Sequence, residues 1–278
     1  MEISASQVKG LRDKTGLPMM ECKKALTEAN GDENLAIEIL RKAGAKTMAG
    51  RTDRTTQEGR IVVFTDKTKN ITAMIELLCE SEPVSNNESF ELLANALAEQ
   101  LATGPGAKTP EELLAQPFPN KPETTLQQFF DELVNKIREV FRLSRIVRID
   151  GVVSSYVHHN KHIAALIVIE GEDNATARDI CMQVASMNPP YLNKDEIDQS
   201  EIEKEREIFA KQAKERNPNK PENILQKIID GLMNTYYAER VLLAQPFVKD
   251  PNKTVQQVCN EANIKIKKTI RWAIGQEN

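Results

Sequence analysis

The chain has 278 residues, a formal net charge of −4, 40% apolar residues and 28% charged residues. This length predicts about two domains plus a small module, and the composition is that of a globular protein with ample material for a core. The acidic balance and the 5% aromatic content argue against a protein that binds nucleic acid through its phosphates. No apolar run is long enough to cross a bilayer, and the first residues carry no signal or transit pattern, which predicts a cytoplasmic protein without membrane contact.

The first 45 residues predict three short helices with marked ends. Gly16 and Gly31 suit the ends of the first two helices, and the third is expected to end at Gly44. Pro18 suits the first turn of the second helix, where its missing N–H would be unpaired anyway. The apolar residues that recur at helical spacing in this second helix are Met19, Cys22, Leu26 and Ala29. Residues 1–45 therefore predict a three-helix, UBA-like module, which buries little core and suits docking.

Residues 46–59 are polar and lack a sustained apolar period, so they predict a linker. Residues 60–150 then predict a first α+β subdomain, in which strand patterns and helix patterns follow one another. Its expected elements are a hairpin of strands 60–65 and 71–78, a helix capped by Asn86 or Asn87, a short helix from Thr109, a spacer at 117–122, a helix from Thr124 and a strand at 145–151.

Residues 151–278 predict a second α+β subdomain. Its expected elements are a hairpin of strands 152–156 and 163–169, a helix at 176–187, an inserted helical hairpin at 198–240, a helix at 254–263 and a strand at 264–274. A strand hairpin followed by a helix occurs in both subdomains, which predicts an internal duplication. The predicted fold class is α+β: the helical module, then two small antiparallel sheet-plus-helix subdomains with a protruding antiparallel helical hairpin.

The sequence shows no arrangement of residues that would predict a catalytic site. It lacks a Gly-rich phosphate loop and paired-histidine metal spacing, so no catalytic residue, metal or cofactor is predicted. His158, His159 and His162 fall on one turn between strands, where a polar turn is favoured over a metal site because no cysteine or acidic ligand is near. The residues Cys22, Cys79, Cys181 and Cys259 are far apart and predict reduced core cysteines.

Three runs near the N-terminus resemble a known family. Arg12-Asp-Lys-Thr-Gly16, Met19-Met-Glu-Cys-Lys-Lys-Ala-Leu26 and Glu28-Ala-Asn-Gly-Asp32 look like the N-terminal signature of elongation factor Ts, the guanine-nucleotide exchange factor of elongation factor Tu. Further blocks similar to that family follow in order at 155–158, 187–191 and 245–255. The resemblance covers nearly the whole chain, and the fold it implies agrees with the predicted elements.

The loop from Cys79 to Asn87 has the composition of a strand-to-helix turn. The resemblance gives it a second interpretation, because Ser81-Glu82-Pro83-Val84 lies at the position of the family's Thr-Asp-Phe-Val motif. In that motif the aromatic ring wedges between helices of the GTPase domain of elongation factor Tu, and the acidic residue helps disturb the magnesium and phosphate end of the nucleotide site. Glu82 keeps the carboxylate on a longer stem, whereas Pro83 replaces the phenylalanine and fills far less volume.

The resemblance implies other contacts with elongation factor Tu. The residues expected to make them are Arg12, Met19, Met20, Lys23, Ile137 and His158, with one of the two methionines alternatively packed in the module's own core. The chain reads Ile137-Arg138 where the family usually reads Ile-Gly, so Arg138 adds bulk and charge at a contact position.

The implied function is a non-enzymatic translation elongation factor that binds elongation factor Tu and promotes GDP release so that GTP can rebind. The alternative is a holding partner or chaperone of the same GTPase with weak exchange activity, because Pro83 is a poor wedge. The helical hairpin is expected to serve partner binding or a homodimer, and no direct contact with nucleic acid is expected.

Overall fold

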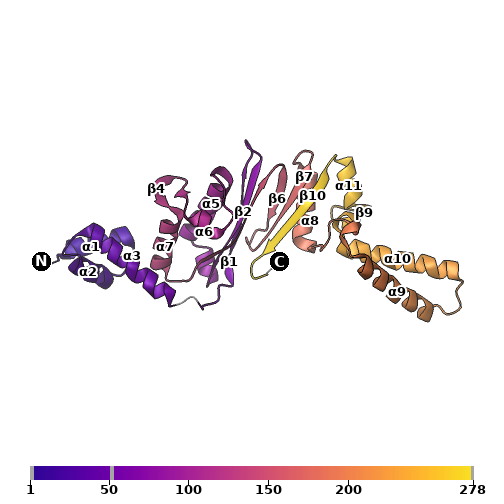
Figure 1. The fold of residues 1–278 in the computed structure, drawn as a ribbon, viewed down its shortest axis with the longest axis horizontal. Helices are drawn as coiled ribbons and strands as arrows, with labels where there is room; N and C mark the ends of the chain where they lie inside the picture. Colours follow the sequence, from indigo (N-terminus) through magenta and orange to yellow (C-terminus); the bar gives the residue numbers. More distant parts are fainter. Residues whose placement is uncertain (1–2, 51–52, 277–278) are drawn as a thin grey trace. The chain divides into compact units, whose positions relative to one another are not determined.

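The computed structural model describes residues 3–50 and 53–276, and it has the predicted α+β class (Figure 1). The chain forms two compact units, which are described separately. Unit 1 comprises Met1–Asp150, His159–Ile163 and Ala273–Asn278, and unit 2 comprises Gly151–His158 and Ala164–Trp272. No helix in the described part of the chain is both long and apolar enough to span a membrane.

Unit 1 begins with the three predicted helices, α1 (Ala5–Thr15), α2 (Met19–Glu28) and α3 (Glu33–Ala49). A capping box between Ser4 and Gln7 starts α1, and Gly16 ends it in the left-handed region at φ 68°. The buried residues of this small core include Leu11, Cys22, Leu26, Ala36 and Leu40. The prediction that the third helix ends at Gly44 was wrong, because α3 continues to Ala49; a glycine inside a helix lowers its stability but does not end it.

A three-stranded antiparallel sheet forms the centre of unit 1. Its strands are β1 (Glu58–Asp66), β2 (Ile71–Cys79) and β5 (Arg142–Asp150), in the order β1-β2-β5. The helix α5 (Glu88–Thr103) begins at the N-cap Asn87, packs on β1 and β2, and buries its apolar face in the same core. The remaining elements of unit 1 are α4 (Glu82–Ser85), α6 (Pro110–Leu114), β3 (Pro117–Phe118), β4 (Lys121–Thr125) and α7 (Leu126–Ile137).

Unit 2 repeats this order of elements. Its sheet consists of β6 (Val153–Val157), β7 (Ile163–Glu170) and β10 (Lys265–Ala273), in the order β10-β7-β6. The other elements are α8 (Ala175–Met187), η1 (Lys194–Glu196), α9 (Gln199–Arg216), α10 (Glu222–Arg240), η2 (Leu242–Ala244), β8 (Pro246–Phe247), β9 (Asp250–Thr254) and α11 (Val255–Glu261). In each unit a hairpin and a helix lead to a pair of short strands, a further helix and a return strand beside the second strand, in agreement with the predicted duplication.

The repeat extends to single hydrogen bonds. Gln116 precedes the strand pair β3–β4, and its Oε1 accepts from Gln100 of α5 at 3.0 Å. Gln245 precedes β8–β9, and its Oε1 accepts from Gln183 of α8 at 2.9 Å. Both following helices start with the same pattern of capping box, formed by Thr125 with Gln128 and by Thr254 with Gln257. The predicted spacer at 117–122 was therefore wrong, because its residues pair as β3 and β4.

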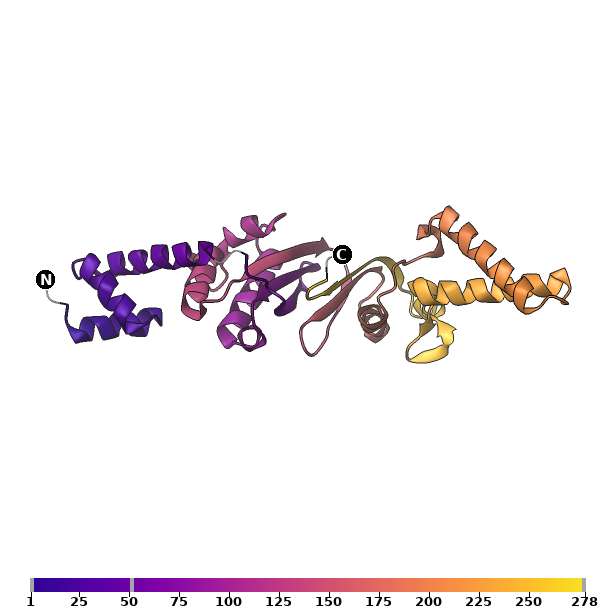
Figure 2. The same ribbon diagram turned by 90° about the horizontal axis from the view of Figure 1, so that it is seen from below.

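The predicted helical hairpin is present in unit 2 as α9 and α10, which lie side by side in both views (Figure 2). It occupies the place in unit 2 where unit 1 has only the short α6. At its base the Glu201 carboxylate accepts hydrogen bonds from the hydroxyls of Tyr236 at 2.6 Å and Tyr191 at 3.1 Å, and it pairs with Arg240. These partners, the Tyr236 hydroxyl first, hold the pKa of Glu201 below its ordinary value.

Candidate functional site

The segment Ser81–Val84 forms the start of the short helix α4, directly after the central strand β2. Ser81 is the extended N-cap residue and Pro83 lies in the first turn, where a proline fixes the backbone without losing a helix hydrogen bond. Glu82 and Pro83 are exposed, and Val84 packs partly against the core of unit 1. The segment therefore presents a carboxylate and a small apolar ring on a rigid turn.

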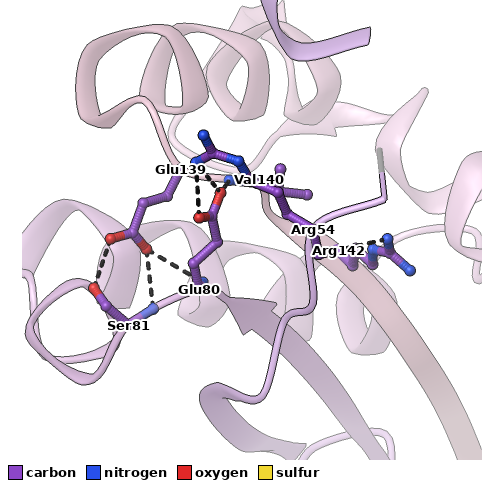
Figure 3. A network of polar contacts seen from close by, with 6 residues as sticks. All are labelled: Arg54, Glu80, Ser81, Glu139, Val140 and Arg142. Atoms are coloured by element: carbon purple, nitrogen blue, oxygen red, sulfur yellow. Dashed lines mark hydrogen bonds and ion pairs between the residues drawn. The ribbon is translucent and has the colours of Figure 1, made fainter. Parts of the chain in front are cut away.

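Two carboxylates hold this segment in place (Figure 3). Glu139 follows α7, and its Oε2 accepts from the backbone N–H groups of Glu80 at 3.2 Å and Ser81 at 3.1 Å, while its Oε1 accepts from Ser81 Oγ at 2.6 Å. In return, the Glu80 carboxylate accepts from the backbone N–H of Val140 at 2.8 Å. Each of the two loops thus supplies a charged acceptor for backbone donors of the other.

The segment that precedes β1 joins the same network. Arg54 Nη1 lies 3.0 Å from Glu80 Oε2, and the Arg54 carbonyl oxygen accepts from Arg142 Nη2 at 3.4 Å (Figure 3). Sequence reasoning did not assign roles to Arg54, Glu80 or Glu139. The available signal was adjacency, because Glu80 directly precedes the motif and Glu139 directly follows Ile137-Arg138.

The thiol beside the motif is not a reactive group. Burial, with the nearby Glu139 carboxylate as the second cause, raises the pKa of Cys79 to about 12, and its Sγ lies 3.3 Å from the Ser81 carbonyl oxygen. All four cysteines are free and buried, which confirms the prediction of reduced core cysteines. The described residues contain no group of three or more histidines, cysteines or carboxylates that could hold a metal ion.

The two residues at the end of α7 differ in their surroundings. Ile137 is half-buried against the core of unit 1. Arg138 ends the helix in the left-handed region at φ 67°, where a glycine is the favoured residue, because a Cβ there crowds the backbone. Its exposed guanidinium forms an ion pair with Glu21 of α2, so both partners of this pair belong to unit 1.

The predicted contact residues of the N-terminal module are all on its surface. Arg12 is exposed and pairs with its neighbour Asp13, and Lys23 is exposed on α2. Met19 and Met20 are 47% and 75% exposed, so the expectation that one of them packs in the module's core was wrong. Their position at the first turn of α2 explains this, because Leu17 precedes them and fills that part of the core.

His158 belongs to unit 2 and follows β6. Its half-buried ring accepts from or donates to the Tyr156 hydroxyl through Nδ1 at a distance of 3.0 Å. The structure thus brings together Ser81–Val84 with the segment after Ile137 in unit 1, whereas His158 is supported separately by its own strand. The roles of all these residues in partner binding stay predictions.

The fold and this surface define a class of protein: an α+β protein that presents exposed side chains on an internally braced turn. Residues 80–276 match the family model described as "Elongation factor TS". The elongation factor Ts of Thioalkalivibrio sulfidiphilus is 38% identical over 279 residues, which cover 99% of this chain and 93% of that protein. The elongation factor Ts of Chlorobaculum parvum is 39% identical and is covered to 99%, as is this chain.

The elongation factor Ts of Legionella pneumophila is also 39% identical, and the alignment covers 99% of this chain and 92% of that protein. The chain therefore belongs to the elongation factor Ts family and is a translation elongation factor. This agrees with the resemblance seen in the N-terminal runs and in the later blocks.

Proposed function

We propose that this protein acts in the cytoplasm, binds the GTPase elongation factor Tu, and promotes release of GDP so that GTP can rebind. The observation that carries the proposal is the presentation of Glu82 and Pro83. Both are exposed on a turn that is fixed by the Glu80 and Glu139 carboxylates, at the position of the family's exchange motif. Family membership over nearly the full chain supports the same partner.

Exchange needs no chemical step in this protein. A factor that binds the nucleotide-free GTPase more tightly than the GDP-bound form weakens GDP binding by the same factor, because the two binding equilibria are linked. Surface contacts suffice for this, and no nucleophile or proton transfer is required. We assign these contacts to Ser81, Glu82, Pro83 and Val84, with further contacts from Arg12, Met19, Met20, Lys23, Ile137 and His158.

Pro83 favours a second candidate, a holding partner of elongation factor Tu with weak exchange activity. A proline ring offers much less apolar area than a phenyl ring, so it wedges less effectively into a partner's core. Against this, Pro83 stiffens the first turn of α4, so less conformational entropy is lost on binding. The helical hairpin α9–α10 is a further surface for the partner or for a homodimer.

The rate of release of a fluorescent GDP analogue from the cognate elongation factor Tu separates the two candidates. An exchange factor accelerates release, and Glu82→Ala then slows it. Pro83→Phe is expected to speed release by about tenfold, because it restores an apolar wedge. The control Glu123→Ala changes an exposed carboxylate on β4 and should leave the rate unchanged.

A stable complex without acceleration by the wild type would favour the holding partner, and rescue by Pro83→Phe would identify the missing wedge as the reason. If no complex forms with the cognate GTPase, both candidates are excluded.

A further inference from the structure

The short helix α4 cannot hold its own orientation. It has four residues, fewer than an isolated helix needs to be stable in water. Its N-cap residue, Ser81, makes no side-chain capping bond to the helix, and its hydroxyl donates to Glu139. The direction in which Glu82 and Pro83 point therefore depends on what holds the two ends of α4: Val84 and Ser85 pack toward the core at one end, and Ser81 is held at the other.

Ser81 is held by one carboxylate from a distant part of the chain. The Glu139 carboxylate accepts three hydrogen bonds from the pair Glu80-Ser81, two from backbone N–H groups and one from the Ser81 hydroxyl. Hydrogen bonds to a charged acceptor are stronger than neutral ones and have defined directions. Three bonds on two neighbouring residues fix both the position and the rotation of the turn that starts α4.

The reverse contact fixes the segment that supplies Glu139. The Glu80 carboxylate accepts from the Val140 N–H at 2.8 Å and is itself paired with Arg54 at 3.0 Å. Glu139 lies between Arg138, which ends α7 in the left-handed region, and Val140, which leads into β5. The two carboxylates thus form a closed brace in which neither loop can rotate without breaking bonds to the other.

We infer that Glu80 and Glu139 are positioning residues for the exchange motif: their reciprocal hydrogen bonds set the orientation of Glu82 and Pro83 toward the GTPase. This role rests on the proposed exchange function. Neither carboxylate needs to touch the partner, so their loss should alter what the bound factor does to the nucleotide more than whether the factor binds.

The brace can be tested first without any partner, by backbone amide hydrogen exchange in the full chain. Glu139→Ala should lower the protection of the Glu80 and Ser81 amides about tenfold or more, and Glu80→Ala should do the same at Val140. Glu139→Gln should keep most of the protection. Its amide oxygen can accept from the two backbone donors while its NH₂ group donates to Ser81 Oγ, which can also act as an acceptor.

The functional test measures GDP release from elongation factor Tu across a range of factor concentrations. Glu139→Ala should lower the maximal release rate about tenfold, with less than a threefold change in the half-saturating concentration, because the exposed contacts remain. Glu139→Gln should stay within about threefold of the wild type in both values, and Ser81→Ala should fall between the two variants. Glu123→Ala is again the matched control.

Four outcomes overturn the role. Unchanged amide protection in Glu139→Ala would show that the brace does not hold the turn. Lost protection with an unchanged maximal rate would show that exchange does not depend on the brace. A rise in half-saturating concentration alone would make Glu139 a binding contact. A wild type that does not accelerate release would exclude the proposed function, and the positioning role with it.

Discussion

The two units differ in how the segment after the second strand contacts the segment before the return strand, a contact called the joint below. In unit 1 the segment after β2 meets the segment before β5 through the carboxylates of Glu80 and Glu139. In unit 2 the segment after β7 meets the segment before β10 by close backbone approach: a Cβ placed on Gly171 would lie 2.5 Å from the Asn263 carbonyl oxygen. The shared topology therefore does not need carboxylates at this joint. The two carboxylates occur in unit 1, which is also the unit that contains α4 and the predicted exchange motif.

The sheets differ in a similar way. The central strand of unit 1 carries Glu76, which is 2% exposed and forms an ion pair with Arg145 of β5. The central strand of unit 2, β7, buries only apolar side chains, from Ala164 to Ile167 and at Ile169. At this joint and in its central strand, unit 1 thus has polar contacts where unit 2 has apolar packing and one glycine.

Breaking the buried ion pair should have the largest effect. Glu76→Ala should lower the free energy of unfolding of unit 1 by about 3 kcal/mol or more, because it leaves a largely buried guanidinium without its carboxylate. Amide hydrogen exchange of β2 in denaturant measures this loss for unit 1 alone. The double variant Glu76→Leu with Arg145→Met should recover most of the stability, since two apolar residues of similar volume replace the pair. A loss below about 1 kcal/mol in the single variant would contradict the dependence on polar contacts.

Replacing the glycine at the joint of unit 2 should have the second-largest effect on stability. Gly171→Ala should lower the free energy of unfolding by about 2–3 kcal/mol, because Gly171 has φ +116° and its new Cβ would meet the Asn263 carbonyl. Gly151 has φ +125° but open space around its Cβ position, so Gly151→Ala carries the backbone strain alone and should lose less. Fluorescence of Trp272, the single tryptophan, which is buried in unit 2, follows the unfolding. Equal losses in both variants would show that the close approach adds nothing.

Replacing Arg138 at the end of α7 should have the smallest effect, and it should raise the stability instead of lowering it. Arg138→Gly should raise the free energy of unfolding by about 0.5–1 kcal/mol, since glycine adopts the left-handed conformation without strain. The ion pair with Glu21 is about half exposed and offsets only a few tenths of this gain. Glu21→Gln, which removes the ion pair and keeps Arg138, measures that part separately in the same denaturation experiment. A destabilised Arg138→Gly would mean that the ion pair outweighs the backbone strain.

Local sequence patterns predicted most of the fold. The helix ends at Gly16 and Asn87 and the helical hairpin between residues 198 and 240 follow from caps and periodicity, which act within a few residues. The strand pair β3–β4 was missed because β3 has only two residues and each strand begins with or contains a proline, which usually indicates a spacer. The candidate motif was found from its position in a family pattern and not from local physics.

The sequence by itself determined the α+β class, the order of the longer elements and the family, because these depend on periodicity, turn residues and extended motifs. Only the tertiary structure showed that Glu80 and Glu139, 59 positions apart, hold each other's loops. It also decided that both Met19 and Met20 are exposed, and that Arg138 occupies a left-handed helix end. Such contacts depend on which loops the sheet brings side by side, and a carboxylate in sequence does not indicate which distant N–H group it will meet.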